Sequence, residues 1–533
     1  MYAPCAEPAV CAHVRSKLIG MSCTTLLVGK SASYDGSTIV ARNDDSGSGK
    51  YDPKKFVAVK PEDQPRHYKS VISHMELDLP EDPCLYSIVP NVLPNRGVLA
   101  EAGVNEYNVA MSATETIAVN SRVLAADPLV KLQPAENGHE EIPGGLGEED
   151  IITLVLPYIK NAREGVARLG ELLENYGTYE SNGIIVSDVN EIWYVETIGG
   201  HHWIARRVPD DCYAAIPNQL GIDALDLDDA FSERRMNMCS ADLLDFINAN
   251  HLDRTMPTLE RDEVELNPRI VFGTATTKDA IYNTPRAWYM QRYLNPSEDW
   301  DSPNAKYRPD SQDIPWVREP ESKVTIEDVA FLMGSHFQGT PYDPYGTTGT
   351  AESRHRYRPI GVNRTGQMVC MQIRPYAAPA FRSIMWISYG SGAFTTPAPF
   401  YANVTDTPAY LRDTDGTNAS TDSLYWTNRM LAVMADAHYY DTDGEVEQYV
   451  EDVQAHGHAI IAHTDASIRD DADALADDSA HEGLKAIRLE LQTANDAMAE
   501  WLRARTQKLL NQVLYTTSNL MSNSFKMSDH WMN

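Results

Sequence analysis

Short apolar runs separated by turn residues dominate the first 205 residues of the chain, and this pattern is typical of β-strands. Residues 24–30 and 37–42 predict a hairpin, because Ser33-Tyr34-Asp35-Gly36 between them supplies turn chemistry. Further strands are predicted at residues 56–60, 86–89, 97–103, 108–113, 183–187, 192–196 and 202–205.

Helical periodicity interrupts the strands at residues 149–159 and 162–176 and returns at 239–250. Residues 115–146, rich in Gly and Pro, predict a loop. Strands grouped around paired helices favour an α+β fold with sheets packed face to face and helices outside, because a doubly wound fold would alternate strand and helix. Residues 295–320 predict a linker or a long surface loop.

Beyond residue 322 the pattern is mixed, with a helix predicted near 326–334 and strands at 367–373 and 384–389, and from 421 it becomes helical. Long amphipathic helices are predicted at 423–438, 446–463 and 481–514. They predict a helical region, residues 421–533, that either covers the domain formed by residues 23–420 or makes a homo-oligomer contact.

Composition narrows the classes of function. The 533 residues carry a formal net charge of −31, which would repel a nucleic-acid backbone. No stretch of eighteen apolar residues occurs, so no membrane span is expected. The seven cysteines are scattered and odd in number, which indicates a reducing compartment and therefore a cytoplasmic protein.

Cys23 stands at the head of the first apolar strand, with Arg42 and Asp45 on the returning strand. This arrangement suggests a nucleophile whose own α-amino group serves as base, because a terminal amine titrates near ~8. Arg42 near the thiol would favour thiolate, and Asp45 would orient the new ammonium group. The two residues could equally form an ordinary surface ion pair.

An N-terminal nucleophile requires that residues 1–22 be absent from the active protein. This segment is a poor signal peptide, because its apolar run is short and its basic residues follow that run. A propeptide removed autocatalytically, an upstream extension before a start at Met21, and a disordered tail remain open. A start at Met21 would still leave Ser22 ahead of the thiol.

Four motifs together resemble the bacterial dipeptidase A family, cysteine dipeptidases of the N-terminal nucleophile class that are related to secernins and choloylglycine hydrolases. The motifs are CTTLLVGKSASYDGST through ARNDD (23–45), GVNEYNVAMSATET (103–116), YNTPR (282–286) and HFQGTPYDPY (336–345). The resemblance implies a four-layer αββα sandwich and hydrolysis of dipeptides through a thioester, with no cofactor.

The resemblance also implies roles for single residues. Cys23 would be the nucleophile, supported by Arg42 and Asp45, and Asn218 would donate its amide to the oxyanion together with a backbone N–H near Glu115. The relatives' further arginine corresponds loosely to Arg286, a candidate for substrate binding. Arg286 could equally be structural, since residues 282–285 predict a turn, just as Asn218 could be a turn residue.

Glu115 is a candidate on physical grounds, since a carboxylate near the thiol could bind the free ammonium group of a dipeptide, although it could also be a solvated loop charge. No metal is expected: His201 and His202 are adjacent on a strand and point to opposite faces, and no HExxH spacing occurs. Two other functions stay open, an acylase acting on another small amide and a non-catalytic, secernin-like interaction protein.

Overall fold

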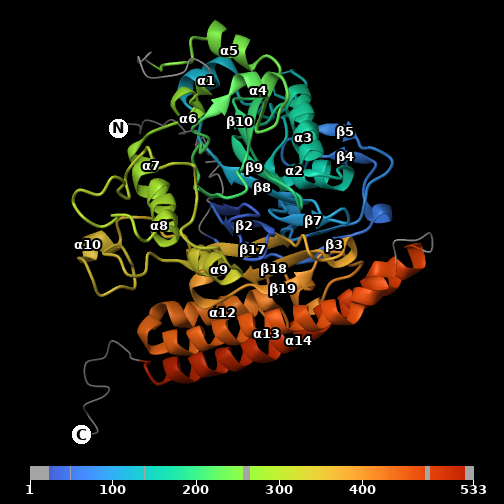
Figure 1. The fold of residues 1–533 in the computed structure, drawn as a ribbon, viewed down its shortest axis with the longest axis vertical. Coiled ribbons are helices and arrows are strands. Elements are labelled where there is room, and N and C mark those ends of the chain that lie inside the picture. The colour runs from blue at the N-terminus through green and yellow to red at the C-terminus, as the bar shows by residue number, and fades with distance from the viewer. Residues whose placement is uncertain (1–22, 48–49, 137, 256–264, 475–479, 522–533) are drawn as a thin grey trace, which may run out of the picture.

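Two large antiparallel sheets form the centre of the computed structural model, which describes residues 23–47, 50–136, 138–255, 265–474 and 480–521 (Figure 1). The predicted leader, residues 1–22, lies outside the described residues. The first sheet has the order β16 (Val317–Arg318), β12 (Tyr213–Ile216), β1 (Thr24–Val28), β2 (Thr38–Asp45), β17 (Thr365–Ile373), β18 (Ser383–Tyr389) and β19 (Ala398–Tyr401).

The second sheet has eight strands and lies against the first. Its order is β14 (Asn237–Cys239), β11 (His202–Arg207), β10 (Ile192–Ile198), β9 (Asn182–Ser187), β8 (Ala110–Thr116), β7 (Gly103–Asn105), β6 (Tyr86–Ile88) and β3 (Val57–Val59). Two small ribbons pair β4 (His67–Lys69) with β5 (Glu76–Asp78) and β13 (Leu225–Asp226) with β15 (Glu265–Leu266).

The two sheets pack face to face, and helices cover their outer faces. β2 contacts β8 and β9, and one buried apolar cluster joins Leu27 and Val40 of the first sheet to Ile185 and Ile204 of the second. A second cluster lies between the first sheet and helices α8 (Thr284–Leu294) and α9 (Ile326–Gly334). A third lies under α2 (Glu148–Val155) and α3 (Ala162–Tyr176). The predicted α+β class is therefore confirmed.

The predicted C-terminal helices form as α12 (Leu424–Ala437), α13 (Tyr439–Ala474) and α14 (Ala480–Ser518), and they pack against β18 and β19 (Figure 1). Asn495 of α14 is hydrogen-bonded to the backbone N–H and carbonyl of Tyr401 at the edge strand, so the helix protects that edge from further strand pairing. An oligomer contact stays a prediction.

Several local predictions were wrong. Residues 97–102 form no strand, and β7 begins only at Gly103. The predicted loop 115–146 contains α1 (Ser121–Ala126), and the turn expected at residues 282–285 is instead the junction where α7 (Thr277–Tyr282) ends and α8 begins at Thr284. The remaining helices are α4 (Leu227–Phe231), α5 (Leu243–Ala249), α6 (Pro268–Val271), α10 (Ala351–Arg354) and α11 (Ala409–Arg412). Among the described helices, none is both long and apolar enough to cross a membrane.

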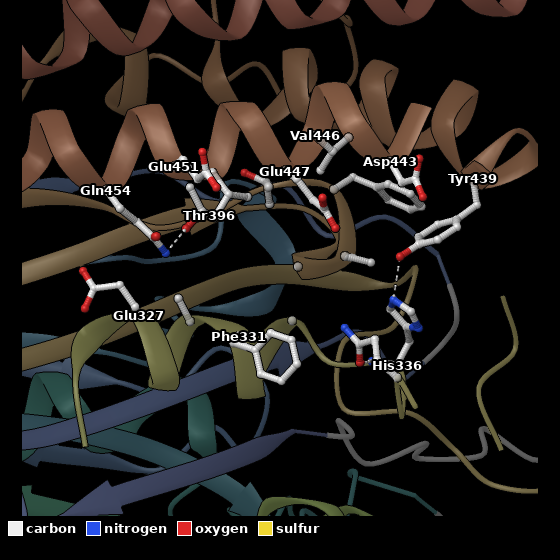
Figure 2. Close-up of a pocket in the computed structure, with 18 of the residues that line it drawn as sticks. Glu327, Phe331, His336, Thr396, Tyr439, Asp443, Val446, Glu447, Glu451 and Gln454 are labelled. Atoms are coloured by element: carbon white, nitrogen blue, oxygen red, sulfur yellow. Dashed lines mark hydrogen bonds between the residues drawn. The ribbon is translucent and has the colours of Figure 1, made fainter. Parts of the chain in front are cut away.

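A cavity of about 410 Å³ opens between α9 and α13 (Figure 2). Apolar side chains such as Phe331 and Val446 share its lining with carboxylates that include Glu447 and Glu451. His336 at one end shares a hydrogen bond with the Tyr439 hydroxyl at 3.1 Å. None of the site residues predicted from the sequence lines this cavity.

Candidate active site

The hairpin of β1 and β2 presents different side chains on its two faces. Thr25 pairs with Arg42 and Thr24 with Asn43 in the antiparallel register, and successive side chains in a strand point to opposite faces. The hydroxyl of Thr25 donates to Glu115 on the facing sheet at 2.9 Å, so the face that carries Thr25 and Arg42 is the one between the sheets. We call it the inner face and the opposite one the outer face.

Arg42 occupies the centre of the inner face and is completely buried. Its Nη2 donates to Glu101 Oε2 at 2.7 Å, and its Nη1 lies 3.4 Å from Glu115 Oε2 and 3.2 Å from the Thr25 hydroxyl. Arg42 therefore joins β2 to two acidic residues that lie far from it in the sequence. Glu115 is buried rather than a solvated loop charge.

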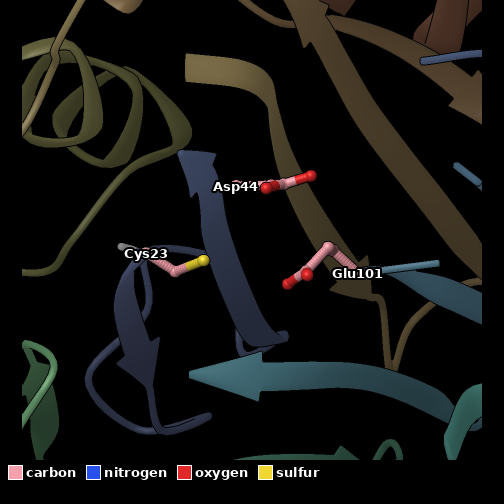
Figure 3. A group of neighbouring side chains, drawn as sticks. All are labelled: Cys23, Asp44 and Glu101. Carbon is pink, nitrogen blue, oxygen red and sulfur yellow. The ribbon is translucent and has the colours of Figure 1, made fainter. Parts of the chain in front are cut away.

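The thiol of Cys23 lies beside two further carboxyl groups, those of Asp44 and Glu101. One atom from each, the Cys23 Sγ and a carboxylate oxygen of the other two, lie within 4.8 Å of one another (Figure 3). All three side chains are completely buried. Lys54 forms a buried ion pair with Asp44 and lies 3.6 Å from Asp52.

Burial decides the protonation of the thiol. It raises the pKa of Cys23 well above its usual value, and the charges of Glu101, Asp44 and Glu115 raise it further, while Arg42 lowers it. Arg42 by itself lowers the pKa of the thiol, as expected. Burial and the three carboxylates together raise that pKa by more, so the expectation that the thiolate is favoured is wrong. Burial likewise raises the pKa of both Glu101 and Glu115, against the lowering effect of Arg42.

Asp45 lies on the outer face and does not pair with Arg42. It forms an ion pair with Arg358, and its Oδ1 accepts from the Thr365 hydroxyl at 2.5 Å. The interpretation of Arg42 and Asp45 as a surface ion pair is wrong, because both side chains are completely buried and each has other partners. Three residues of separation on a strand place their side chains on opposite faces.

Arg286, from the first turn of α8, binds the backbone next to the thiol. Its Nη1 donates to the Cys23 carbonyl oxygen at 2.5 Å and to the Thr24 hydroxyl at 2.6 Å. Its Nη2 donates to Asn218 Oδ1 at 2.8 Å, and its Nε donates to the Tyr282 carbonyl at 2.9 Å. Burial, together with the charge of Arg358, lowers the pKa of Arg286 to about 9. This geometry favours the structural alternative for Arg286 over direct contact with substrate.

Asn218 follows β12, the strand that pairs with β1 on the side away from β2. Its Nδ2 donates to the Thr116 carbonyl at 3.0 Å, and Thr116 ends β8 of the other sheet. Asn218 therefore links the two sheets beside the start of β1. To serve as an oxyanion donor, its amide would have to exchange the Thr116 carbonyl for the substrate oxygen.

Sequence reasoning missed Asp44, Glu101, Lys54 and Arg358. The signal for Asp44 was available, because it lies two residues from Arg42 on a strand and must share its face. Glu101 lies outside any helix or strand, and Arg358 follows a short helix far along the chain, so neither had a local pattern to find it.

Cys23, Asp44 and Glu101 are also the described residues whose sulfur and oxygen atoms are close enough to hold a metal ion. Two neighbouring cations oppose this use. Arg42 already pairs with Glu101 and Lys54 with Asp44, and both would repel a divalent ion.

Comparison with known proteins gives the class and the family. Residues 22–452 match the family described as "Peptidase family C69", so the protein is a hydrolase of the peptidase class. A "Dipeptidase" from Bifidobacterium longum is 52% identical over 537 residues, covering 96% of this chain and 100% of that protein. A "Probable dipeptidase A" from Streptococcus pyogenes is 49% identical over 513 residues, covering 96% and 99%. "Dipeptidase A" from Lactobacillus helveticus is 41% identical over 512 residues, covering 95% and 99%.

The chain therefore belongs to peptidase family C69. The resemblance inferred from the four sequence motifs is confirmed.

Proposed function

We propose that this protein is a cysteine-dependent dipeptidase in which Cys23, freed as the first residue, attacks the peptide carbonyl and forms a thioester. The names of the relatives support the substrate class. The observation that carries the mechanism is the position of the thiol: Cys23 stands at the head of β1, and its sulfur lies beside the carboxyl groups of Asp44 and Glu101 (Figure 3) and within the electrostatic influence of Arg42. The two facing sheets with helices outside support an N-terminal nucleophile hydrolase sandwich.

Because the pKa of Cys23 is raised, its thiol stays protonated at neutral pH, and a base in contact with the thiol must take the proton during the attack. The α-amine of Cys23 is held at that distance by covalent geometry, and a terminal amine accepts a proton near pH ~8. The amine takes the thiol proton as the S–C bond forms, then delivers it to the leaving nitrogen as the C–N bond breaks. Water attacks the thioester, which releases the carboxylic acid and restores the thiol.

The tetrahedral intermediate carries an oxyanion that needs hydrogen-bond donors. The Asn218 amide, which lies at the end of β12 beside β1, and a backbone N–H near Glu115 are the proposed donors. Arg42 compensates the negative charge around the sulfur, and Arg286 fixes the Cys23 carbonyl and hence the start of β1. Asp45 acts by holding Arg358 beside the Thr24 hydroxyl.

Four further proposals concern processing, domain organisation and location. Residues 1–22 are lost on activation, residues 23–420 form the hydrolase domain, and residues 421–533 form the helical region that begins near Leu424. A cytoplasmic location is supported by the free thiols of all five described cysteines, Cys23, Cys84, Cys212, Cys239 and Cys370.

Terminal sequencing combined with Cys23→Ala tests the mechanism. We expect active protein to begin at Cys23, and the variant to lose dipeptide hydrolysis by about 10⁴-fold or more while its unfolding midpoint stays unchanged. Full activity with residues 1–22 still attached would exclude the α-amine as base. Dipeptide hydrolysis by pure Cys23→Ala protein would exclude the thiol as nucleophile.

A further inference from the structure

The group formed by Cys23, Asp44 and Glu101 has acceptor atoms that the protein itself does not use. Asp44 Oδ1 and Glu101 Oε1 are buried and have no hydrogen-bond partner among the described residues. The remaining oxygen of each carboxylate is taken, by Lys54 for Asp44 and by Arg42 for Glu101. Buried acceptors without donors are costly and rare in folded proteins, so these two atoms call for a donor from outside the chain.

Their distance from the sulfur identifies that donor. In a dipeptide the α-nitrogen lies about 2.5 Å from the carbonyl carbon that the sulfur attacks, by standard N–Cα–C geometry. The attacking atom approaches that carbon at about 3–3.5 Å. A carboxylate that accepts from the ammonium group at about 2.7–2.9 Å must therefore lie no more than about 9 Å from the sulfur. Asp44 and Glu101 satisfy this condition, since their oxygen atoms lie within 4.8 Å of Sγ and of each other (Figure 3).

We propose that Asp44 and Glu101 bind the free α-ammonium group of the dipeptide and so select substrates with an unblocked amino terminus. This inference rests on the proposed function of Cys23. It transfers to two other residues the role that the sequence suggested for Glu115, which belongs to the same face but not to the group around the sulfur.

The charges around the group favour a monovalent cation. Arg42 and Lys54 each occupy one oxygen of a carboxylate and leave one free on each, so a single ammonium group can donate to both. An N-acylated substrate would bring a neutral amide to the same place and would leave the carboxylates without a charged donor. The group therefore separates a dipeptidase from an acylase.

A pair of matched substrates tests the proposal. Alanyl-leucine and propionyl-leucine differ only in the α-ammonium group, and kcat/KM for each is measured on the mature wild-type protein and on Glu101→Gln and Asp44→Asn. We expect wild type to prefer alanyl-leucine, and each variant to lose about 10- to 100-fold on alanyl-leucine, the size of a lost charged hydrogen bond. In each variant, kcat/KM for propionyl-leucine should fall by a smaller factor than kcat/KM for alanyl-leucine.

Glu115→Gln is the matched control, because it removes the other carboxylate partner of Arg42 but no member of the group around the sulfur. We expect it to change both substrates by the same factor. If Glu101→Gln fails to fold, Asp44→Asn still tests the proposal, because it leaves the ion pairs of Arg42 with Glu101 and Glu115 intact.

Four outcomes would overturn the proposal, and the last would overturn the proposed function as well. Equal cleavage of both substrates by wild type leaves a hydrolase but removes the ammonium site. Equal losses on both substrates in the two variants would assign the carboxylates to the catalytic amine of Cys23 instead. Stoichiometric metal in wild type that is absent from both variants would assign them to an ion. If wild type cleaves neither substrate, the proposed dipeptidase function fails, and this inference fails with it.

Discussion

The two faces of the β1–β2 hairpin bury charge in different ways. On the outer face Asp45 uses both oxygens, one for Arg358 and one for Thr365, and every guanidinium nitrogen of Arg286 donates to the protein. On the inner face Arg42 is shared between two carboxylates. Single oxygens there have no hydrogen-bond partner among the described residues: Asp44 Oδ1, Glu101 Oε1 and Glu115 Oε1.

This difference separates positioning from chemistry. A network in which both Asp45 oxygens and all three Arg286 guanidinium nitrogens are paired stabilises one backbone arrangement, and here it holds the Cys23 carbonyl through Arg286. A network with buried, unused acceptors is less stable by itself and is suited to a charged ligand. The thiol points into the second kind of network, so the hairpin keeps its rigid support on one face and its reactive group on the other.

The largest effect should come from Arg42→Gln. It leaves Glu101 and Glu115 buried without the guanidinium that pairs with both, and breaking a buried pair in this way costs about 3–5 kcal/mol. Urea unfolding at neutral pH measures the loss. Arg358→Gln is the outer-face control, and we expect a smaller loss because Asp45 keeps the Thr365 hydroxyl. A larger loss for Arg358→Gln would contradict the difference between the faces.

Asn218→Ala should affect catalysis more than stability. If the amide moves from the Thr116 carbonyl to the oxyanion, kcat falls by about 10²–10³-fold with little change in KM. Steady-state kinetics on a dipeptide measures it. Asn283→Ala is the control for the supporting contacts, because Asn283 accepts from the same Arg286 Nη2 at 3.0 Å and donates to the Asn218 carbonyl at 2.9 Å but lacks the oxyanion role. If kcat falls equally in both variants, Asn218 acts only by positioning Arg286 and not as an oxyanion donor.

The smallest effect concerns Glu196 of β10, a buried carboxylate that accepts from the backbone N–H groups of Gly221 and Ile222. Burial raises its pKa from 4.5 to about 8, so the folded state holds this proton more tightly than the unfolded state. Its contribution to stability is complete below pH 4.5 and is lost as the pH rises through 8.

Wild type should therefore lose stability relative to Glu196→Gln as the pH rises from 5 to 9. The difference between their free energies of unfolding should change by about 1–2 kcal/mol, since one pKa unit corresponds to about 1.4 kcal/mol and water entry reduces the effect. Urea unfolding at the two pH values measures this, with the exposed Glu136→Gln as control. If the stability difference between Glu196→Gln and wild type is the same at both pH values, burial alone does not determine the pKa of the carboxyl groups between the sheets.

Much of the fold could be predicted from local pattern. The hairpin at the amino end, the two helices between strand groups and the C-terminal helices were all predicted and are confirmed. Residues 282–285 predict a turn, whereas Pro285 lies in the first turn of α8, a position where proline is common because its missing N–H costs no helical hydrogen bond. The largely apolar residues 97–102 predict a strand, but Gly97 and Leu99 have positive φ angles, so this segment forms only single backbone hydrogen bonds and no regular ladder.

The sequence by itself determined that Cys23 stands before an apolar strand, that Arg42 lies on the next strand, and that the chain carries the motifs of its family. The alternation of side chains along the strand already placed Arg42 and Asp45 on opposite faces, but only the tertiary structure decided which partners each meets there and that Glu101 lies beside the thiol. Strand and helix patterns depend on near neighbours in the chain. Burial and pairing of charge depend on how two sheets pack, which brings together residues that local pattern does not relate.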